Sequence, residues 1–306
     1  MLPDGLRVDG SASIAQSESG TEPCLRRRDS FPAFPRSLQA DMRAGADRSA
    51  TLHLPRILCL HGGGTNANIF RMQCRVLARL LQPYFRLVFA EAPLAALPGP
   101  DVTAAYKDYG PFKAWLCVRD EDPVLETHHI VGTIEDSLKA ARITDDCRGA
   151  TGEWVGLLGF SQGAHLAASI LANQQELRRR AGDDVTWPVY RFGVLLAGRG
   201  PLRWLHPDLP MPAGFVDVSK CTTGMEGEYE SFVNGSPYRL QIPTIHVHGL
   251  TDPNRELHRK LLDQYCDPRS AVLVEWGGNH RVPIKARDVT PVVQQIIAVA
   301  RQEGVL

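Results

Sequence analysis

The feature that most constrains this chain is the pentapeptide Gly159-Phe160-Ser161-Gln162-Gly163, set between an apolar run and a stretch of small residues. Residues 153–159 suit a buried strand, and the residues after Gly163 suit a helix that begins at once. A strand, a sharp turn and a helix in this order hold a serine hydroxyl above the carboxyl edge of a parallel sheet. The pattern therefore predicts that Ser161 is a nucleophile displayed at a sheet edge.

Strand-like and helix-like segments alternate along most of the chain. Strands are expected at 57–60, 85–90, 153–159, 191–197, 243–248 and 271–276, and a helical period runs from Ile69 to Leu80. We expect Thr290 to cap the last helix and Pro291 to occupy its first turn. Two irregular stretches, 94–122 and 198–238, are expected to shape the site. The alternation predicts an α/β fold with a mostly parallel sheet covered by helices on both faces.

The charge balance and hydropathy of the chain bear on whether it binds nucleic acid or membranes. The 34 basic and 34 acidic side chains give a formal net charge of zero, which offers no reason to expect binding to nucleic acid or to an anionic membrane. No apolar run is long enough for a membrane span. Residues 1–50 are rich in Ser, Gly, Pro, Asp and Arg, so we expect a disordered or loosely attached extension before a single domain at 51–306.

The cysteines and the first residues bear on the compartment. The seven cysteines are odd in number, scattered and without a C-x-x-C motif, so neither a disulfide framework nor a zinc ribbon is expected. Residues 1–16 lack the basic start and the apolar core of a secretory signal. The predicted location is the cytoplasm.

A serine hydroxyl is a weak nucleophile until a base, usually a histidine oriented by an acid, accepts its proton. In sheets of this kind the order along the chain is Ser, then Asp or Glu, then His, each beyond the end of a strand. Asp252 follows the strand expected at 243–248, and His280 follows the strand expected at 271–276. Asp252 also stands where it could cap a helix, a role compatible with catalysis. We predict Ser161, Asp252 and His280 as the catalytic triad.

The oxyanion that forms during acyl transfer needs backbone N–H donors. Gln162 is predicted to supply one donor, because it begins the helix after the nucleophile. The glycine run after the first strand is predicted to supply the other, from Gly63 in preference to Gly64. The alternative is that this run only makes a tight connection between strand and helix.

Aromatic residues in the first irregular stretch have two interpretations. Tyr109, Phe112 and Trp115, with Tyr106 beside them, either line a substrate pocket or fill a satellite core. A metal site is not expected, because His246-x-His248 followed by Asp252 lacks the additional ligands of a two-metal hydrolase. No cofactor is predicted.

Several short motifs together resemble one family. They are Leu60-His61-Gly62-Gly63-Gly64-Thr65-Asn66, Glu91-Ala92-Pro93, Pro98-Gly99-Pro100, Gly159-Phe160-Ser161-Gln162-Gly163, Leu196-Ala197-Gly198 and Gly278-Asn279-His280. Over residues 55–303 the chain resembles the FSH family of serine hydrolases. The resemblance implies an α/β-hydrolase fold with Ser161, Asp252 and His280 as the triad.

The Gly-Gly-Gly-Thr-Asn form and the segment from Tyr109 to Trp115 are most similar to fungal members encoded beside polyketide synthases. Those members free an acyl chain from a synthase carrier protein. The resemblance therefore implies an esterase or thioesterase of secondary metabolism, with a small acyl ester or a carrier-bound acyl thioester as substrate and a polyketide synthase as partner. Two alternatives use the same fold: an acyltransferase with the same triad, and a catalytically silent binding module.

Overall fold

The computed structural model describes residues 50–99, 102–117, 125–182, 188–220 and 238–306. These residues belong to one compact unit, Gly45–Leu306. The extension predicted for residues 1–50 lies almost wholly outside the described residues and stays a prediction.

The unit alternates strands and helices. In chain order these are β1 (Arg56–Leu60), α2 (Ala67–Gln73), α3 (Arg75–Leu81), β2 (Arg86–Ala90), β3 (Leu94–Ala95), α4 (Thr103–Tyr106), β4 (Lys113–Ala114), α5 (Thr127–Asp146), β5 (Trp154–Phe160), α6 (Gln162–Ala181), β6 (Phe192–Leu196), β7 (Leu202–Trp204), β8 (Phe215–Asp217), β9 (Thr244–Gly249), α8 (Arg255–Lys260), the π-helix η1 (Leu261–Tyr265), β10 (Ala271–Trp276) and α9 (Ala286–Gln302).

Six strands form the main sheet in the order β10-β9-β6-β5-β1-β2, and every neighbouring pair is parallel. β5, which leads to Ser161, therefore lies in the interior of the sheet between β1 and β6. Because all six strands run the same way, the loops after β1, β5, β6, β9 and β10 leave from one edge of the sheet. The predicted α/β-hydrolase fold is confirmed.

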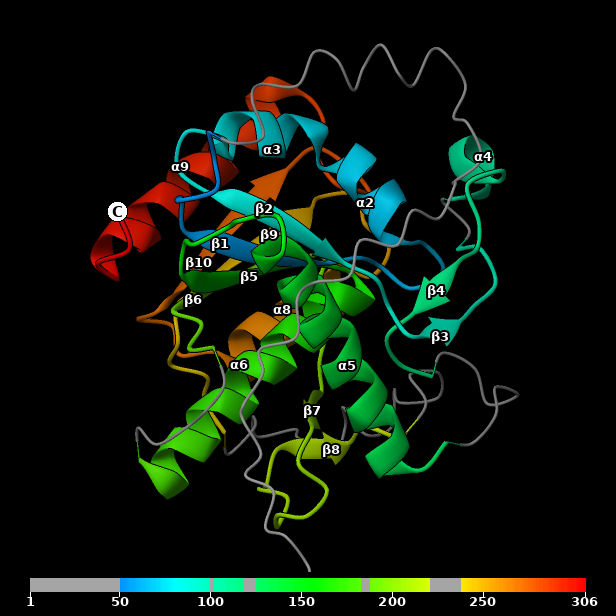
Figure 1. Cartoon of the computed structure of the whole chain (residues 1–306), viewed down its shortest axis with the longest axis vertical. Coiled ribbons are helices and arrows are strands. Elements are labelled where there is room, and N and C mark those ends of the chain that lie inside the picture. Colours follow the sequence, from blue (N-terminus) through cyan, green and yellow to red (C-terminus); the bar gives the residue numbers. More distant parts are fainter. Residues whose placement is uncertain (1–49, 100–101, 118–124, 183–187, 221–237) are drawn as a thin grey trace, which may run out of the picture. The chain divides into compact units, whose positions relative to one another are not determined.

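Alternate residues of the strands face two separate cores. Leu58 and Leu60 of β1 pack with helices α5 and α6, whereas Ile57 and Cys59 pack with α2, α3 and α9. Figure 1 shows these two groups of helices on opposite faces of the sheet. Burial on both faces explains why the strands are continuously apolar rather than alternating.

A charged cluster fastens the end of α5 to the starts of β1 and β2. Asp145 is almost completely buried, and its carboxylate accepts three hydrogen bonds from Arg86, at 2.6, 2.9 and 3.1 Å. The Arg56 guanidinium lies 3.6 Å from the same carboxylate and stacks over Trp154 at 4.1 Å. Because a buried carboxylate without its partners is costly, this cluster keeps the helix in register with the sheet.

The last helix begins earlier than expected. α9 starts at Ala286, so the prediction that Thr290 caps it and Pro291 lies in its first turn is wrong. Val289, which is fully buried, already packs on the sheet, and that packing extends the helix toward its N-terminus. The Thr290 hydroxyl donates to the Ala286 carbonyl instead of acting as a cap.

The predicted helix at 69–80 is two helices, α2 and α3, which meet at Cys74. The two irregular stretches contain the short pairs β3–β4 and β7–β8. Between β9 and β10 the chain forms α8 followed by η1. The differences fall at short elements, where periodicity spans too few residues to decide.

The cysteines that the structure describes are in two states. Cys59, Cys74, Cys147 and Cys266 are free, and Cys117 is disulfide-bonded. A single disulfide is not a disulfide framework, so the expectation about a framework stays a prediction.

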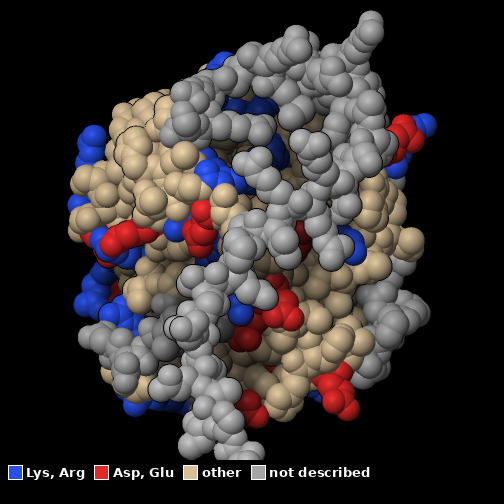
Figure 2. Space-filling model, viewed as in Figure 1, with Lys and Arg blue, Asp and Glu red and all other residues tan. Residues whose placement is uncertain are grey.

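Side chains of both charges are spread over the face drawn in Figure 2. Among the helices that the structure describes, none combines the length and the apolar character needed to cross a membrane.

Candidate active site

Ser161 lies on a strained turn between β5 and α6. Its backbone has φ 52° and ψ −114°, a conformation that residues with a side chain rarely adopt. The turn is held in place because the Ser161 N–H donates to the Leu196 carbonyl of β6 at 2.8 Å. The strand and the helix therefore impose the geometry that raises the hydroxyl at the sheet edge.

The three residues predicted from their order in the chain come together at this edge. His280 Nε2 lies 3.0 Å from Ser161 Oγ, and His280 Nδ1 lies 2.7 Å from Asp252 Oδ2. Because a carboxylate only accepts, Nδ1 carries the proton and Nε2 is left to accept from the serine hydroxyl. In this arrangement an imidazole can take the proton of a serine that attacks a carbonyl.

Asp252 is 5% exposed and its carboxylate is held by several donors. Burial alone raises the pKa of Asp252, but the Asn254 N–H on Oδ1 and the neighbouring His280 more than offset this, so the pKa lies below its usual value. The carboxylate is therefore charged at neutral pH. Helix α8 begins just after it, with Asn254 rather than Asp252 at the N-cap position.

A fourth residue, His258, contacts the same carboxylate. Its Nε2 lies 3.0 Å from Asp252 Oδ2, and its ring stacks on His280 with centroids 5.8 Å apart. No motif in the sequence points to this residue. In the sequence, His258 stands six residues after Asp252, on the helix that follows. That spacing does not show that the helix turns the His258 side chain toward Asp252.

Asp252, His258 and His280 each place one atom that could bind a metal ion within 4.8 Å of the others. A cation there would compete for His280 Nδ1, which is bonded to Asp252. We therefore assign these atoms to hydrogen bonds rather than to a metal site. His246 and His248 of β9 contact one another edge to face, with centroids 5.9 Å apart and planes inclined by 88°. Burial lowers the pKa of both to about 3, which keeps them neutral.

The loop after β1 places its glycines beside the nucleophile. Gly64 has φ 70°, and a side chain there would overlap the backbone of Gly99. Its N–H donates to the Lys113 carbonyl at 2.9 Å, so it is occupied. Within the described part of the chain, the backbone N–H groups of Gly63 and Gln162 donate to no other residue. Both therefore remain available to a bound oxygen.

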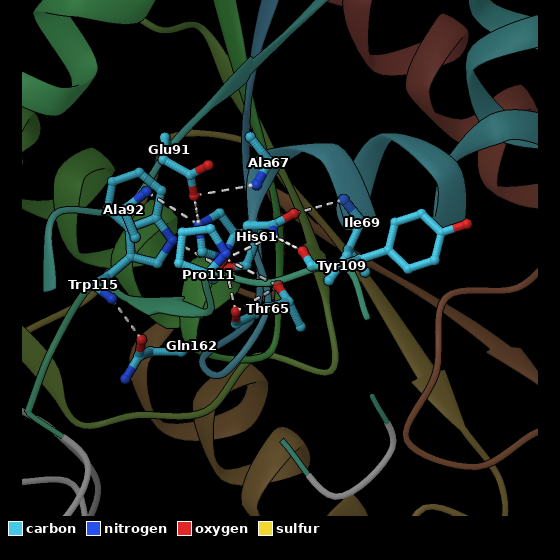
Figure 3. Close-up of polar contacts among 12 residues, drawn as sticks. His61, Thr65, Ala67, Ile69, Glu91, Ala92, Tyr109, Pro111, Trp115 and Gln162 are labelled. Atoms are coloured by element: carbon cyan, nitrogen blue, oxygen red, sulfur yellow. Dashed lines mark hydrogen bonds and ion pairs between the residues drawn. The ribbon is translucent and has the colours of Figure 1, made fainter. Parts of the chain in front are cut away.

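His61 holds this loop in shape, as Figure 3 shows. Its Nδ1 lies 2.8 Å from the Gly62 carbonyl, and its Nε2 accepts from the Ala92 N–H at 3.1 Å. The Thr65 hydroxyl also donates to the Gly62 carbonyl. The Trp115 indole N–H donates to the His61 carbonyl at 2.9 Å. These contacts give His61 a structural role in the loop.

The Gln162 side chain ties the helix start to the loop after β4. Its Oε1 accepts from the Trp115 N–H at 2.8 Å, and its Nε2 donates to the Leu116 carbonyl at 3.0 Å. Figure 3 shows this amide beside the backbone of Trp115. The first irregular stretch is thereby fixed against the residue after the nucleophile.

The structure separates the three aromatic candidates. Trp115 is 0% exposed and packs in the core with α5 and α6, so its prediction as a pocket residue is wrong and the core interpretation holds. Tyr109 and Phe112 are partly exposed. The Asn66 side chain donates to the Tyr109 and Pro111 carbonyls at 2.7 and 3.0 Å, which fixes this segment near the glycine loop.

An apolar hollow of about 540 Å³, including space open to solvent, lies elsewhere, between α5 and α6. Ile134, Leu138, Ile170 and Leu177 are among its lining residues. Ile170 is nine residues along α6 from Ser161, or roughly 13 Å at 1.5 Å per residue. The hollow therefore does not surround the serine.

The residues 50–292 match the family model described as serine hydrolase (FSH1). The chain belongs to this family of serine hydrolases.

Relatives in this family match over most of their own length. Esterase dbaE of Emericella nidulans is 55% identical over 269 residues, which cover 86% of this chain and 96% of the relative. Esterase pigG of Monascus ruber is 51% identical over 271 residues, which cover 85% and 98%. The solved structure of esterase PE8 covers 81% of this chain and 93% of its own at 15% identity, with a TM-score of 0.43, so the fold assignment rests on the strand order.

At Gly163, helix α6 of this serine hydrolase approaches the end of β1 so closely that a side chain has no room. A Cβ at Gly163 would overlap the carbonyl oxygens of Leu60 and His61, so Gly163→Ala must displace the turn that carries Ser161. We expect about 1–3 kcal/mol less stability toward urea. Because the serine moves, we also expect a loss on the order of 100-fold in kcat/KM on a p-nitrophenyl ester.

The matched control is Gly132→Ala on α5, where a Cβ meets nothing within 4 Å. Replacing a glycine inside a helix is expected to raise stability by about 0.5–1 kcal/mol with no change in rate. Equal behaviour of the two variants would contradict the packing argument.

Proposed function

We propose that this serine hydrolase is an esterase that forms an acyl-enzyme on Ser161, with His280 as base and Asp252 as the acid that orients it. The observation that carries the proposal is the position of the His280 ring, 3.0 Å from Ser161 Oγ on one side and 2.7 Å from Asp252 Oδ2 on the other. The relatives named as esterases support the same class of reaction.

Acylation begins when Ser161 Oγ attacks the acyl carbonyl and its proton passes to His280 Nε2. Asp252 holds the imidazole in the tautomer that accepts and stabilises the imidazolium. The oxyanion is bound by the N–H groups of Gly63 and Gln162. His280 then gives its proton to the leaving oxygen or sulfur as the bond to the acyl carbon breaks.

Deacylation repeats these steps with water in place of the serine. His280 takes a proton from water, the hydroxide oxygen attacks the acyl carbon, and the proton returns to Ser161 Oγ as the acid leaves. An ester and a thioester give the same acyl-enzyme, because only the leaving group differs.

For the natural substrate we propose an acyl ester or a carrier-bound acyl thioester, with a polyketide-like chain and a polyketide synthase as partner. The support is the resemblance of the glycine loop and of the Tyr109–Trp115 segment to fungal family members. Tyr109 and Phe112 stay as pocket candidates, since they are partly exposed and their segment is bonded to Asn66 beside the loop.

We propose the cytoplasm as the location. Its support is the four free cysteines, Cys59, Cys74, Cys147 and Cys266, while the disulfide at Cys117 stands against it. Alkylation of the chain taken from its native cells would show whether Cys117 is reduced there.

The proposed role of Ser161 is tested by Ser161→Ala, measured against Ser137→Ala on α5 as the control. Loss of the nucleophile is expected to lower kcat on a p-nitrophenyl ester by on the order of 10⁴–10⁶. A fluorophosphonate should label the wild type and Ser137→Ala but not Ser161→Ala. Equal labelling of all three proteins would exclude Ser161 as the nucleophile.

The thioester part of the proposal has its own test. We expect kcat/KM to be higher on an acyl-pantetheine thioester than on an oxygen ester with the same acyl chain and a leaving group of matched size. Rates on the two substrates should fall together in Ser161→Ala. A clear preference for the oxygen ester would reject a carrier-bound substrate while leaving the esterase intact.

A further inference from the structure

The carboxylate of Asp252 is shared by two histidines. His280 Nδ1 and His258 Nε2 approach the same oxygen, Oδ2, at 2.7 and 3.0 Å. The other oxygen, Oδ1, accepts from the Asn254 N–H at 2.8 Å. A triad requires only the first of these contacts, so the second imidazole calls for an explanation.

Both ring nitrogens of His258 face acceptors. Nε2 faces the Asp252 carboxylate, Nδ1 lies 3.1 Å from the Gly198 carbonyl, and the side chain is 1% exposed. A neutral imidazole has one N–H and can satisfy only one of the two. That proton belongs on Nε2, because a lone pair against a carboxylate is the more repulsive alternative. Protonation would satisfy both acceptors but would place a charge inside the site.

The ring of His258 also stacks on the proposed base. The centroids of His258 and His280 are 5.8 Å apart and their planes are inclined by 25°. A charge on His258 opposes the imidazolium that forms on His280 during attack. At an effective dielectric constant of 20, two unit charges at this separation change an equilibrium by roughly 100-fold.

We propose that His258 is a positioning residue of the active site: in its neutral form it donates to Asp252 Oδ2 and holds the carboxylate toward His280, and in its protonated form it switches the site off. This inference rests on the proposed function, since it acts through the pair Asp252–His280. The bonds involved are hydrogen bonds only, and the one proton gained or lost is exchanged with solvent.

Among the histidines packed around the pair Asp252–His280, His258 is the one that can gain a charge in mild acid. Besides Asp252 and His280, the described part of the chain brings His248 against its ring and His246 behind that. Burial holds the pKa of both at about 3, so they stay neutral in mild acid. Burial lowers the pKa of His258 as well, and the bond to Asp252 partly opposes this. His258 is thus neutral near pH 7 and charges as the pH falls.

Two substitutions separate the contacts of His258. In His258→Gln the amide nitrogen can take the place of Nε2 and keep the bond to Asp252, whereas in His258→Asn it can take the place of Nδ1 and reach only Gly198. We expect kcat/KM of the Gln variant to stay within about threefold of the wild type, and that of the Asn variant to fall about 10–100-fold. If His258 only fills space, the Gln and Asn variants should have the same kcat/KM. The control for loss of an imidazole is His53→Gln, at an exposed position.

The pH profile supplies the second readout. If the enzyme is inactivated by two protons, a plot of log(kcat/KM) against pH has a limiting slope of about 2 at acid pH. If one proton inactivates the enzyme, that slope is about 1. We expect about 2 for the wild type and for His53→Gln, and about 1 for His258→Gln. Circular dichroism at each pH restricts the comparison to folded protein.

A wild-type slope of about 1 overturns the proposal without any variant, as does equal activity of the Gln and Asn variants. Failure of the proposed function gives a different result, because the wild type would then not be labelled at Ser161 by a fluorophosphonate. Labelling at Ser161 together with unchanged His258 variants rejects the role of His258 alone.

Discussion

The site depends on one backbone constraint, the left-handed conformation of Ser161 at the end of β5. It is imposed from both sides: β6 accepts the Ser161 N–H, and α6 approaches β1 so closely that only glycine fits at position 163. The strain is thus maintained by the packing of a central strand and its helix, where many contacts oppose its release.

The parallel sheet then brings the remaining groups to the same place. β1 ends at the glycine loop, β9 ends before Asp252 and β10 ends before His280, so residues more than 200 positions apart meet at one edge. The surroundings also set the charges. Asp252 keeps its charge through donors around a buried carboxylate, while burial holds His246 and His248 neutral. The Asp252 carboxylate itself faces the imidazoles of His258 and His280.

The sequence could predict what depends on order along the chain. The convergence of Ser161, Asp252 and His280 could be predicted because each follows a strand, and strand ends meet in a parallel sheet. The contacts of His258 and of the Gln162 amide could not be predicted, and the sequence left Trp115 open between pocket and core, since these depend on which face a short helix or loop turns toward its neighbours. The start of α9 was misplaced because Val289 packs on the sheet, which outweighs the capping preference of Thr290.

If acyl transfer passes through Ser161, rapid-quench mass spectrometry should detect the acyl-enzyme itself. The wild type is mixed with excess p-nitrophenyl ester, quenched in acid before deacylation and digested. We expect the acyl mass on the peptide that contains Ser161, together with a burst of p-nitrophenol equal to the enzyme concentration. Product formation with the acyl group on another residue, or on none at any quench time, would exclude Ser161 as the acylated nucleophile.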